Sequence, residues 1–123
     1  MDWRSCITLS IEPTELDDIA FGSICMVGSF NNWSNTANPM ETVNPNLGLS
    51  NSDWWVDTWT ITQTNAYGDV KFCNYNDWDY NWGADAFPYG CGEQSGPNIP
   101  ATPGTYKVFF NDITGQYNFI KME

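Results

Sequence analysis

Aromatic rings alternate with amide and carboxylate side chains in one short stretch of this sequence. The rings are Tyr75, Trp78, Tyr80 and Trp82, and the polar residues among them are Asn74, Asn76, Asp77, Asp79 and Asn81. The C–H faces of a pyranose pack on an aromatic plane, while its hydroxyls donate and accept hydrogen bonds. Because Asn does both and Asp only accepts, the stretch has the side chains that a sugar-binding surface needs.

Lys71 lies just before this stretch and is one of only four basic residues. In a strand it would point away from Val70 and Phe72, toward the opposite face. We interpret it as a candidate hydrogen-bond donor to a ligand. A salt bridge to Asp69 or Asp57 explains it nearly as well.

A structural explanation of the rings stands beside the functional one. Trp78 and Trp82 could fill space beneath a loop, because aromatic residues dominate protein cores too. We favour binding, since seven Trp and six Tyr exceed what one small core would hold. Both residue types are enriched at binding surfaces.

The charge of the chain limits its partners. Fifteen acidic and four basic residues give a formal net charge of −11. Nucleic acids and anionic membranes require a positive footprint, so we expect neither as a partner. A neutral ligand suits this surface.

Catalysis and metal binding have little support. The chain has no His, which removes the commonest general base and metal ligand. The D-x-D-x-N run from Asp77 starts like a calcium loop, but Gly83 is one place late and Pro88 replaces the bidentate Glu. We expect no cofactor, metal or enzyme activity. An irregular calcium site built from Asp77, Asp79 and Asp85 is one alternative, and glycoside hydrolysis by two carboxylates is another.

The four cysteines, Cys6, Cys25, Cys73 and Cys91, show no C-x-x-C spacing, which argues against structural zinc. An even number in a small acidic β domain indicates an oxidising compartment. We expect Cys73 to pair with Cys91, anchoring the Gly- and Pro-rich residues 83–103, and Cys6 to pair with Cys25. Four reduced cysteines packed as small hydrophobes are the alternative.

The elements that must position these residues are strands. At 123 residues the chain is one domain, residues 1–123, rich in strand and turn formers. Alternation or apolar runs predict strands over residues 6–11, 24–30, 54–62, 70–73, 105–110 and 116–122. Trp55 and Trp59 share one parity, so we assign both to the interior. About seven antiparallel strands in two sheets indicate an all-β, immunoglobulin-like sandwich.

Two segments resemble a known family. Residues 28–33 read G-x-F-N-x-W, which resembles the strand and turn of early-set immunoglobulin-like starch- and glycogen-binding modules. A second set of segments resembles the repeated modules of the outer-membrane starch-utilisation proteins SusE and SusF: residues 70–72, 76–78, 81–83, 96–99 and the hairpin over 104–117. The resemblance covers roughly the last hundred residues.

The resemblance implies a non-catalytic module that holds α-glucan outside the cell. Trp33 and Trp78 would supply two rings that follow the curve of amylose, and Lys71 and Asn76 would bind glucose hydroxyls. The expected ligand-binding residues are therefore Trp33, Lys71, Asn76, Trp78, Tyr80 and Trp82. A β-glucan or xylan could use the same surface.

We also expect a monomer at the outer cell surface. No apolar run reaches the length of a membrane span, and the N-terminus lacks the regions of a signal peptide. The chain therefore reads as a mature or excised domain that does not insert into a membrane. The alternative function is a structural or adhesive domain whose exposed rings or open strand edges bind other proteins or further copies.

Overall fold

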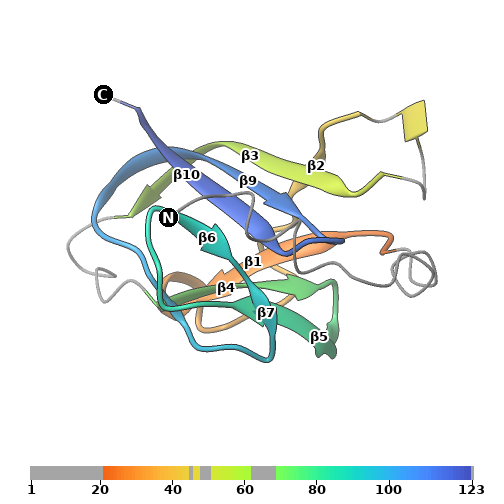
Figure 1. Ribbon diagram of the computed structural model, residues 1–123, viewed down its shortest axis with the longest axis horizontal. Helices are drawn as coiled ribbons and strands as arrows, with labels where there is room; N and C mark the ends of the chain where they lie inside the picture. The colour runs from red at the N-terminus through yellow and green to blue at the C-terminus, as the bar shows by residue number, and fades with distance from the viewer. Residues whose placement is uncertain (1–20, 45, 48–50, 62–68, 123) are drawn as a thin grey trace.

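The computed structural model describes residues 21–44, 46–47, 51–61 and 69–122, and these form two antiparallel sheets (Figure 1). The first sheet contains β1 (Ile24–Gly28), β4 (Asp69–Asn74), β5 (Asp77–Gly83) and β7 (Glu93–Gln94), in that order, with β8 (Ile99–Pro100) also paired to β4. The second sheet has the order β2 (Glu41–Thr42), β3 (Asp53–Ile61), β9 (Gly104–Asn111), β10 (Gln116–Met122) and β6 (Tyr89–Cys91).

The predicted all-β sandwich is confirmed, with ten described strands rather than about seven. The difference comes from β2, β7 and β8, which are two residues long, and β6, which has three. Strands this short have no alternation that a sequence could reveal. The predicted strand over residues 6–11 lies outside the described residues.

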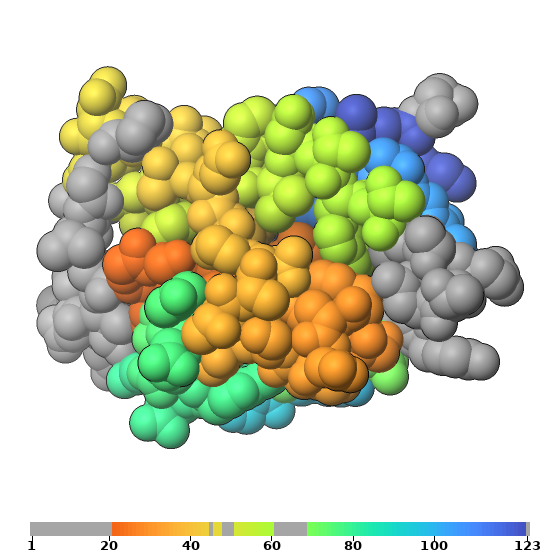
Figure 2. Space-filling view, turned by 180° about the vertical axis from the view of Figure 1, so that it is seen from behind, coloured from red at the N-terminus to blue at the C-terminus, as the bar shows by residue number. Residues whose placement is uncertain are grey.

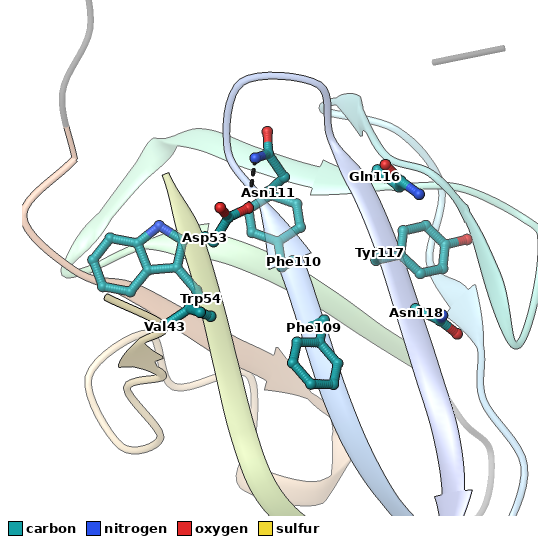
Figure 3. A pocket seen from close by; sticks show the side chains of 9 residues that line it. All are labelled: Val43, Asp53, Trp54, Phe109, Phe110, Asn111, Gln116, Tyr117 and Asn118. Carbon is teal, nitrogen blue, oxygen red and sulfur yellow. Dashed lines mark hydrogen bonds between the residues drawn. The ribbon is translucent and has the colours of Figure 1, made fainter. Parts of the chain in front are cut away.

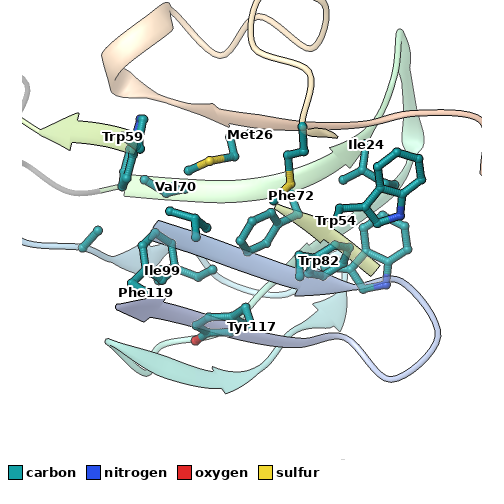
Figure 4. Packing of buried hydrophobic residues seen from close by; sticks show 14 of the residues in the cluster. Ile24, Met26, Trp54, Trp59, Val70, Phe72, Trp82, Ile99, Tyr117 and Phe119 are labelled. Carbon is teal, nitrogen blue, oxygen red and sulfur yellow. The ribbon is translucent and has the colours of Figure 1, made fainter. Parts of the chain in front are cut away.

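The core lies between the two sheets, where aromatic rings from both layers meet (Figure 4). Phe72 of β4 stacks on Phe110 of β9, with ring centroids 4.4 Å apart and planes at 11°. Phe72 also contacts Tyr117 and Phe119 of β10. Burying one such side chain contributes about 1.5–3 kcal/mol, so this cluster holds the layers together.

A β-bulge in β3 reverses the expected orientation of its tryptophans. Trp59 is buried as predicted, but Trp55 is only half buried, and the interior position is taken by Trp54, which is 3% exposed. The register against β9 shifts between Val56 and Trp59, so two residues of β3 face Lys107 alone. One extra residue flips the parity before the bulge. The interior assignment of Trp55 was therefore wrong.

Both predicted disulfides are wrong. Cys25 of β1 and Cys73 of β4 are paired in register, and both are free, fully buried thiols. Each predicted bridge would need one of these two sulfurs. Cys91 lies in the second sheet, away from Cys73, and Cys6 lies outside the described residues. For the β1–β4 pair, the alternative of reduced, packed cysteines holds.

Candidate functional site

The segment after β1 folds back over the outer face of the first sheet. The 3₁₀ turn Ser29–Asn31 (η1) is followed by Asn32 and Trp33, both with left-handed φ near 60° (58° and 60°). The Trp33 N–H donates to the Gly28 carbonyl at 2.8 Å, which closes the turn. This reversal directs residues 33–38 back along the sheet.

Asn31 holds this turn through its side chain. Its Oδ1 accepts from the Gly28 N–H at 3.1 Å, and its Nδ2 donates to the Met26 carbonyl at 3.2 Å and to Asn38 Oδ1 at 2.7 Å. An amide is needed here because one side chain must accept and donate at once. The Asn of the G-x-F-N-x-W segment therefore has a structural role.

Trp33 packs on the sheet that it covers. Its partly buried side chain contacts a small cluster of Cys25, Val27 and Cys73 on the outer face. Burial raises the pKa of both thiols to about 11. The predicted ring thus has part of its surface against the sheet and part accessible.

The β4–β5 turn carries two exposed rings, Trp78 of the predicted site and Tyr75, which is not among the predicted ligand-binding residues. Tyr75 is 46% exposed and Trp78 is 43% exposed, on either side of the turn residue Asn76, whose φ is +58°. Across the turn, Asn74 Nδ2 donates to Asp77 Oδ2 at 3.1 Å. Two aromatic side chains and two further polar groups therefore share one hairpin tip.

A backbone hydrogen bond joins the two segments, because the Asn76 N–H donates to the Asn35 carbonyl at 3.0 Å. The Tyr75 N–H donates to the carbonyl of Ser23, just before β1, at 3.0 Å. Figure 2 shows the segment after β1, orange to gold, in contact with the green β4–β5 turn on one face of the molecule. We call this face the hairpin surface; it consists of Trp33, Tyr75, Asn76 and Trp78.

Lys71 is already bonded to the backbone. Its half-buried Nζ donates to the Gly96 carbonyl at 2.6 Å, and burial lowers the pKa of the ammonium. Two of its three N–H donors are left for other partners. Asp57, considered as its salt-bridge partner, instead pairs with Lys107 at 2.6 Å.

Tyr80 and Trp82 belong to the core side of β5. Trp82 is 5% exposed and packs edge-on against Phe21, with ring centroids 5.2 Å apart. Tyr80 also meets Phe21, at 5.3 Å. The structure therefore leaves Asn76 and Trp78 exposed at the hairpin tip and places Asn35, two residues after Trp33, against Asn76. Tyr80 and Trp82 are packed toward the core.

Sequence reasoning missed a groove on the outer face of the second sheet (Figure 3). It has a volume of about 280 Å³ and is lined by Val43, Asp53, Trp54, Phe109, Phe110, Asn111, Gln116, Tyr117 and Asn118. The available signal was Phe109, an aromatic residue at an outward position between Val108 and Phe110, both of which are buried.

Asp112 is a buried carboxylate at the turn beside this groove. It is 8% exposed, and its Oδ2 accepts a hydrogen bond from Trp54 Nε1 at 2.8 Å. Burial raises its pKa from 3.8 to about 6, although that hydrogen bond opposes the rise. The pair ties the start of β3 to the β9–β10 turn.

Metal ligands do not gather in the described part of the chain. Among those residues no three His, Cys, Asp or Glu side chains form a group that could hold an ion, and Asp77, Asp79 and Asp85 form none. Within the same residues, no helix has the length and apolar character to cross a bilayer.

Comparisons of this chain with protein-family models, with curated proteins and with solved structures gave no match.

Proposed function

We propose that this protein is a non-catalytic module that binds a neutral polysaccharide, with α-glucan as the favoured ligand. The observation that carries the proposal is the hairpin surface, where Tyr75 and Trp78 are exposed beside Asn76 and next to the segment that holds Trp33. Exposed rings beside the Asn76 amide suit a ligand with apolar C–H faces and hydroxyl edges.

Charge and energetics agree with this ligand class. A net charge of −11 disfavours anionic polymers, whereas an uncharged glycan meets no long-range repulsion. Stacking of a nucleobase on an aromatic side chain contributes about 1–3 kcal/mol per base, and we take this value by analogy for a sugar ring on an indole or phenol. Two or three such contacts would give useful affinity without a deep cleft.

The resemblance of residues 28–33 to early-set starch- and glycogen-binding modules, and of segments within residues 70–83 to the modules of SusE and SusF, supports α-glucan over other glycans. On this proposal the module is a monomer at the outer cell surface and holds its ligand without cofactor or catalysis. Lys71 contributes through the donors that its Gly96 contact leaves open.

Affinity electrophoresis tests the proposal. Native gels containing amylopectin, xylan, β-glucan or no glycan are compared for the parent protein and for Trp78→Ala, Tyr75→Ala and Ile120→Ala. We expect amylopectin to retard the parent, Trp78→Ala and Tyr75→Ala to migrate faster, and Ile120→Ala to match the parent. Ile120 is a suitable control because it is 45% exposed on the second sheet, away from the hairpin surface. If the parent protein migrates equally in the gels with amylopectin, xylan, β-glucan and no glycan, the proposal is refuted.

A structural or adhesive role is the alternative, and the described sheet edges give it less support. Edge strands β2 and β7 have two residues and β6 has three, so these strands themselves offer little backbone for strand addition. Beyond Trp55, β3 has no strand on its β2 side among the described residues, and this is the edge that an added strand would use. The open edge of β1 is covered, because Met26 N–H bonds to the Asn38 carbonyl and Met40 N–H to the Ile24 carbonyl. The C-terminal hairpin is not a free edge along residues 116–118, where β10 pairs with β6. Size-exclusion chromatography across protein concentrations would expose self-assembly.

A further inference from the structure

We infer a second ligand site on this protein: the groove over β3, β9 and β10 binds one or two residues of a neutral oligosaccharide. This site lies on the second sheet, whereas the hairpin surface lies on the first, and the two sheets form opposite layers of the sandwich (Figure 1). The inference goes beyond the proposed function, because its residues are separate from the hairpin surface.

The groove is built by the outward residues of three neighbouring strands. Asp53 of β3 pairs with Asn111 of β9, and Phe109 of β9 pairs with Asn118 of β10. Alternation sends the residues between them inward, so their backbones form the floor. Val43 closes one side, where its N–H donates to the Asp53 carbonyl at 2.9 Å.

The polar groups at the groove are of the kind that hydroxyls bind. The side-chain amides of Gln116 and Asn118 have no hydrogen-bond partner among the described residues, while Asp53 uses only Oδ1, which accepts from Asn111 at 2.8 Å. Two amides and one carboxylate oxygen offer donors and acceptors together. Figure 3 shows Gln116 and Asn118 along β10, across the groove from Asp53 on β3.

Asn111 shapes the groove, and its side chain keeps only one amide N–H without a hydrogen-bond partner among the described residues. Its Oδ1 accepts from the Ile113 and Thr114 N–H groups, both at 2.9 Å, and its Nδ2 holds Asp53. The carboxylate is therefore fixed in position before any ligand arrives. Such preorganisation lowers the entropy cost of binding.

Phe109 is the apolar wall, and it is braced from behind. Its half-buried ring stacks on Trp55, with centroids 5.8 Å apart and planes at 26°. Lys107 Nζ lies 5.4 Å from the centroid of the Trp55 ring and is held by Asp57 at 2.6 Å. These contacts fix the Phe109 ring beside the side-chain amides of Gln116 and Asn118.

Size and charge favour a neutral saccharide over other occupants. The groove volume of about 280 Å³ lies at the small end of ligand pockets, near the size of one or two sugar rings. Asp53 and the net charge of −11 repel anions. Of the apolar residues that line the groove, Trp54, Phe110 and Tyr117 are buried, and only Val43 and Phe109 have accessible side chains, which is little for a protein partner.

Indole NMR tests this second site separately from the first. The protein is ¹⁵N-labelled at tryptophan, and Trp55→Phe and Trp78→Phe assign the two reporter signals. Maltoheptaose, xylohexaose and cellohexaose are then titrated. We expect at least one sugar to shift the Trp55 indole, which touches Phe109, with an affinity that Asn118→Ala weakens about tenfold. Ile120→Ala, on the same face outside the groove, should leave that affinity unchanged.

The two reporters separate the outcomes. A shift of Trp55 alone supports the groove and counts against the hairpin surface, whereas a shift of Trp78 alone overturns the groove. Absence of a Trp55 shift with all three sugars also overturns it, as does an Asn118→Ala variant that binds like the parent. A Trp55 shift on concentrating the protein without sugar would assign the groove to a second copy of the chain and refute a saccharide.

Discussion

Replacing Asp112 by Asn should stabilise the protein at neutral and alkaline pH and leave it unchanged in acid. The carboxylate is 8% exposed and accepts a hydrogen bond from Trp54 Nε1 at 2.8 Å. Burial disfavours its charged form and raises its pKa from 3.8 to about 6. The Asn side chain keeps an oxygen for the Trp54 indole without carrying a charge.

The sign and size of the effect follow from proton linkage. Because the pKa is higher in the folded state, that state binds more protons between pH 3.8 and about 6. The stabilising contribution is complete below pH 3.8 and is lost as the pH rises through 6. At 1.36 kcal/mol per pKa unit, the ionised carboxylate costs about 3 kcal/mol at pH 8. Asp112→Asn should recover about 1–3 kcal/mol there, since the new amide must also find acceptors.

Urea unfolding followed by tryptophan fluorescence measures this difference at pH 4, 6 and 8. Asp79→Asn is the matched control, because it removes one negative charge from an exposed side chain. At each pH, the free energy of unfolding of the parent is subtracted from that of the variant. This difference removes the general charge repulsion that both acidic proteins share. Two results would contradict this account of Asp112: a lower free energy of unfolding for Asp112→Asn than for the parent at pH 8, or a difference between the two proteins that does not change with pH. Either result would mean that burial does not disfavour the charged carboxylate.

Two further predictions concern the face around Trp33. Cys25 and Cys73 are fully buried with pKa values raised to about 11, so iodoacetamide at pH 8 should modify neither in the folded protein and both in urea. Mass spectrometry of digested protein counts the labelled sites, and rapid labelling without urea would contradict the packing. Asn31→Ala removes four hydrogen bonds at the Trp33 turn, which should lower the free energy of unfolding by about 1–3 kcal/mol. Asn31→Ala should also weaken retention of the protein in amylopectin gels. Unchanged retention would show that the Trp33 turn does not contribute to glycan binding.

Local patterns in the sequence determined the fold class and much of the strand placement. The predicted strands over residues 105–110 and 116–122 correspond to β9, Gly104–Asn111, and β10, Gln116–Met122. Val70 and Phe72 face the core while Lys71 does not, as alternation requires. These features depend on neighbours along one strand, so a single sequence contains the information.

The features that depend on which strands pair with one another are set by the tertiary structure and not by local sequence. Pairing with β9 places a bulge in β3 and exchanges Trp55 for Trp54 in the core. Pairing of β1 with β4 sets Cys25 beside Cys73 and places Cys91 in the other sheet. The groove likewise needs Asp53, Phe109 and Asn118 from three strands at matching register. Register and strand order arise from long-range packing, in which one inserted residue reverses every side chain on one side of it, and no local pattern encodes that choice.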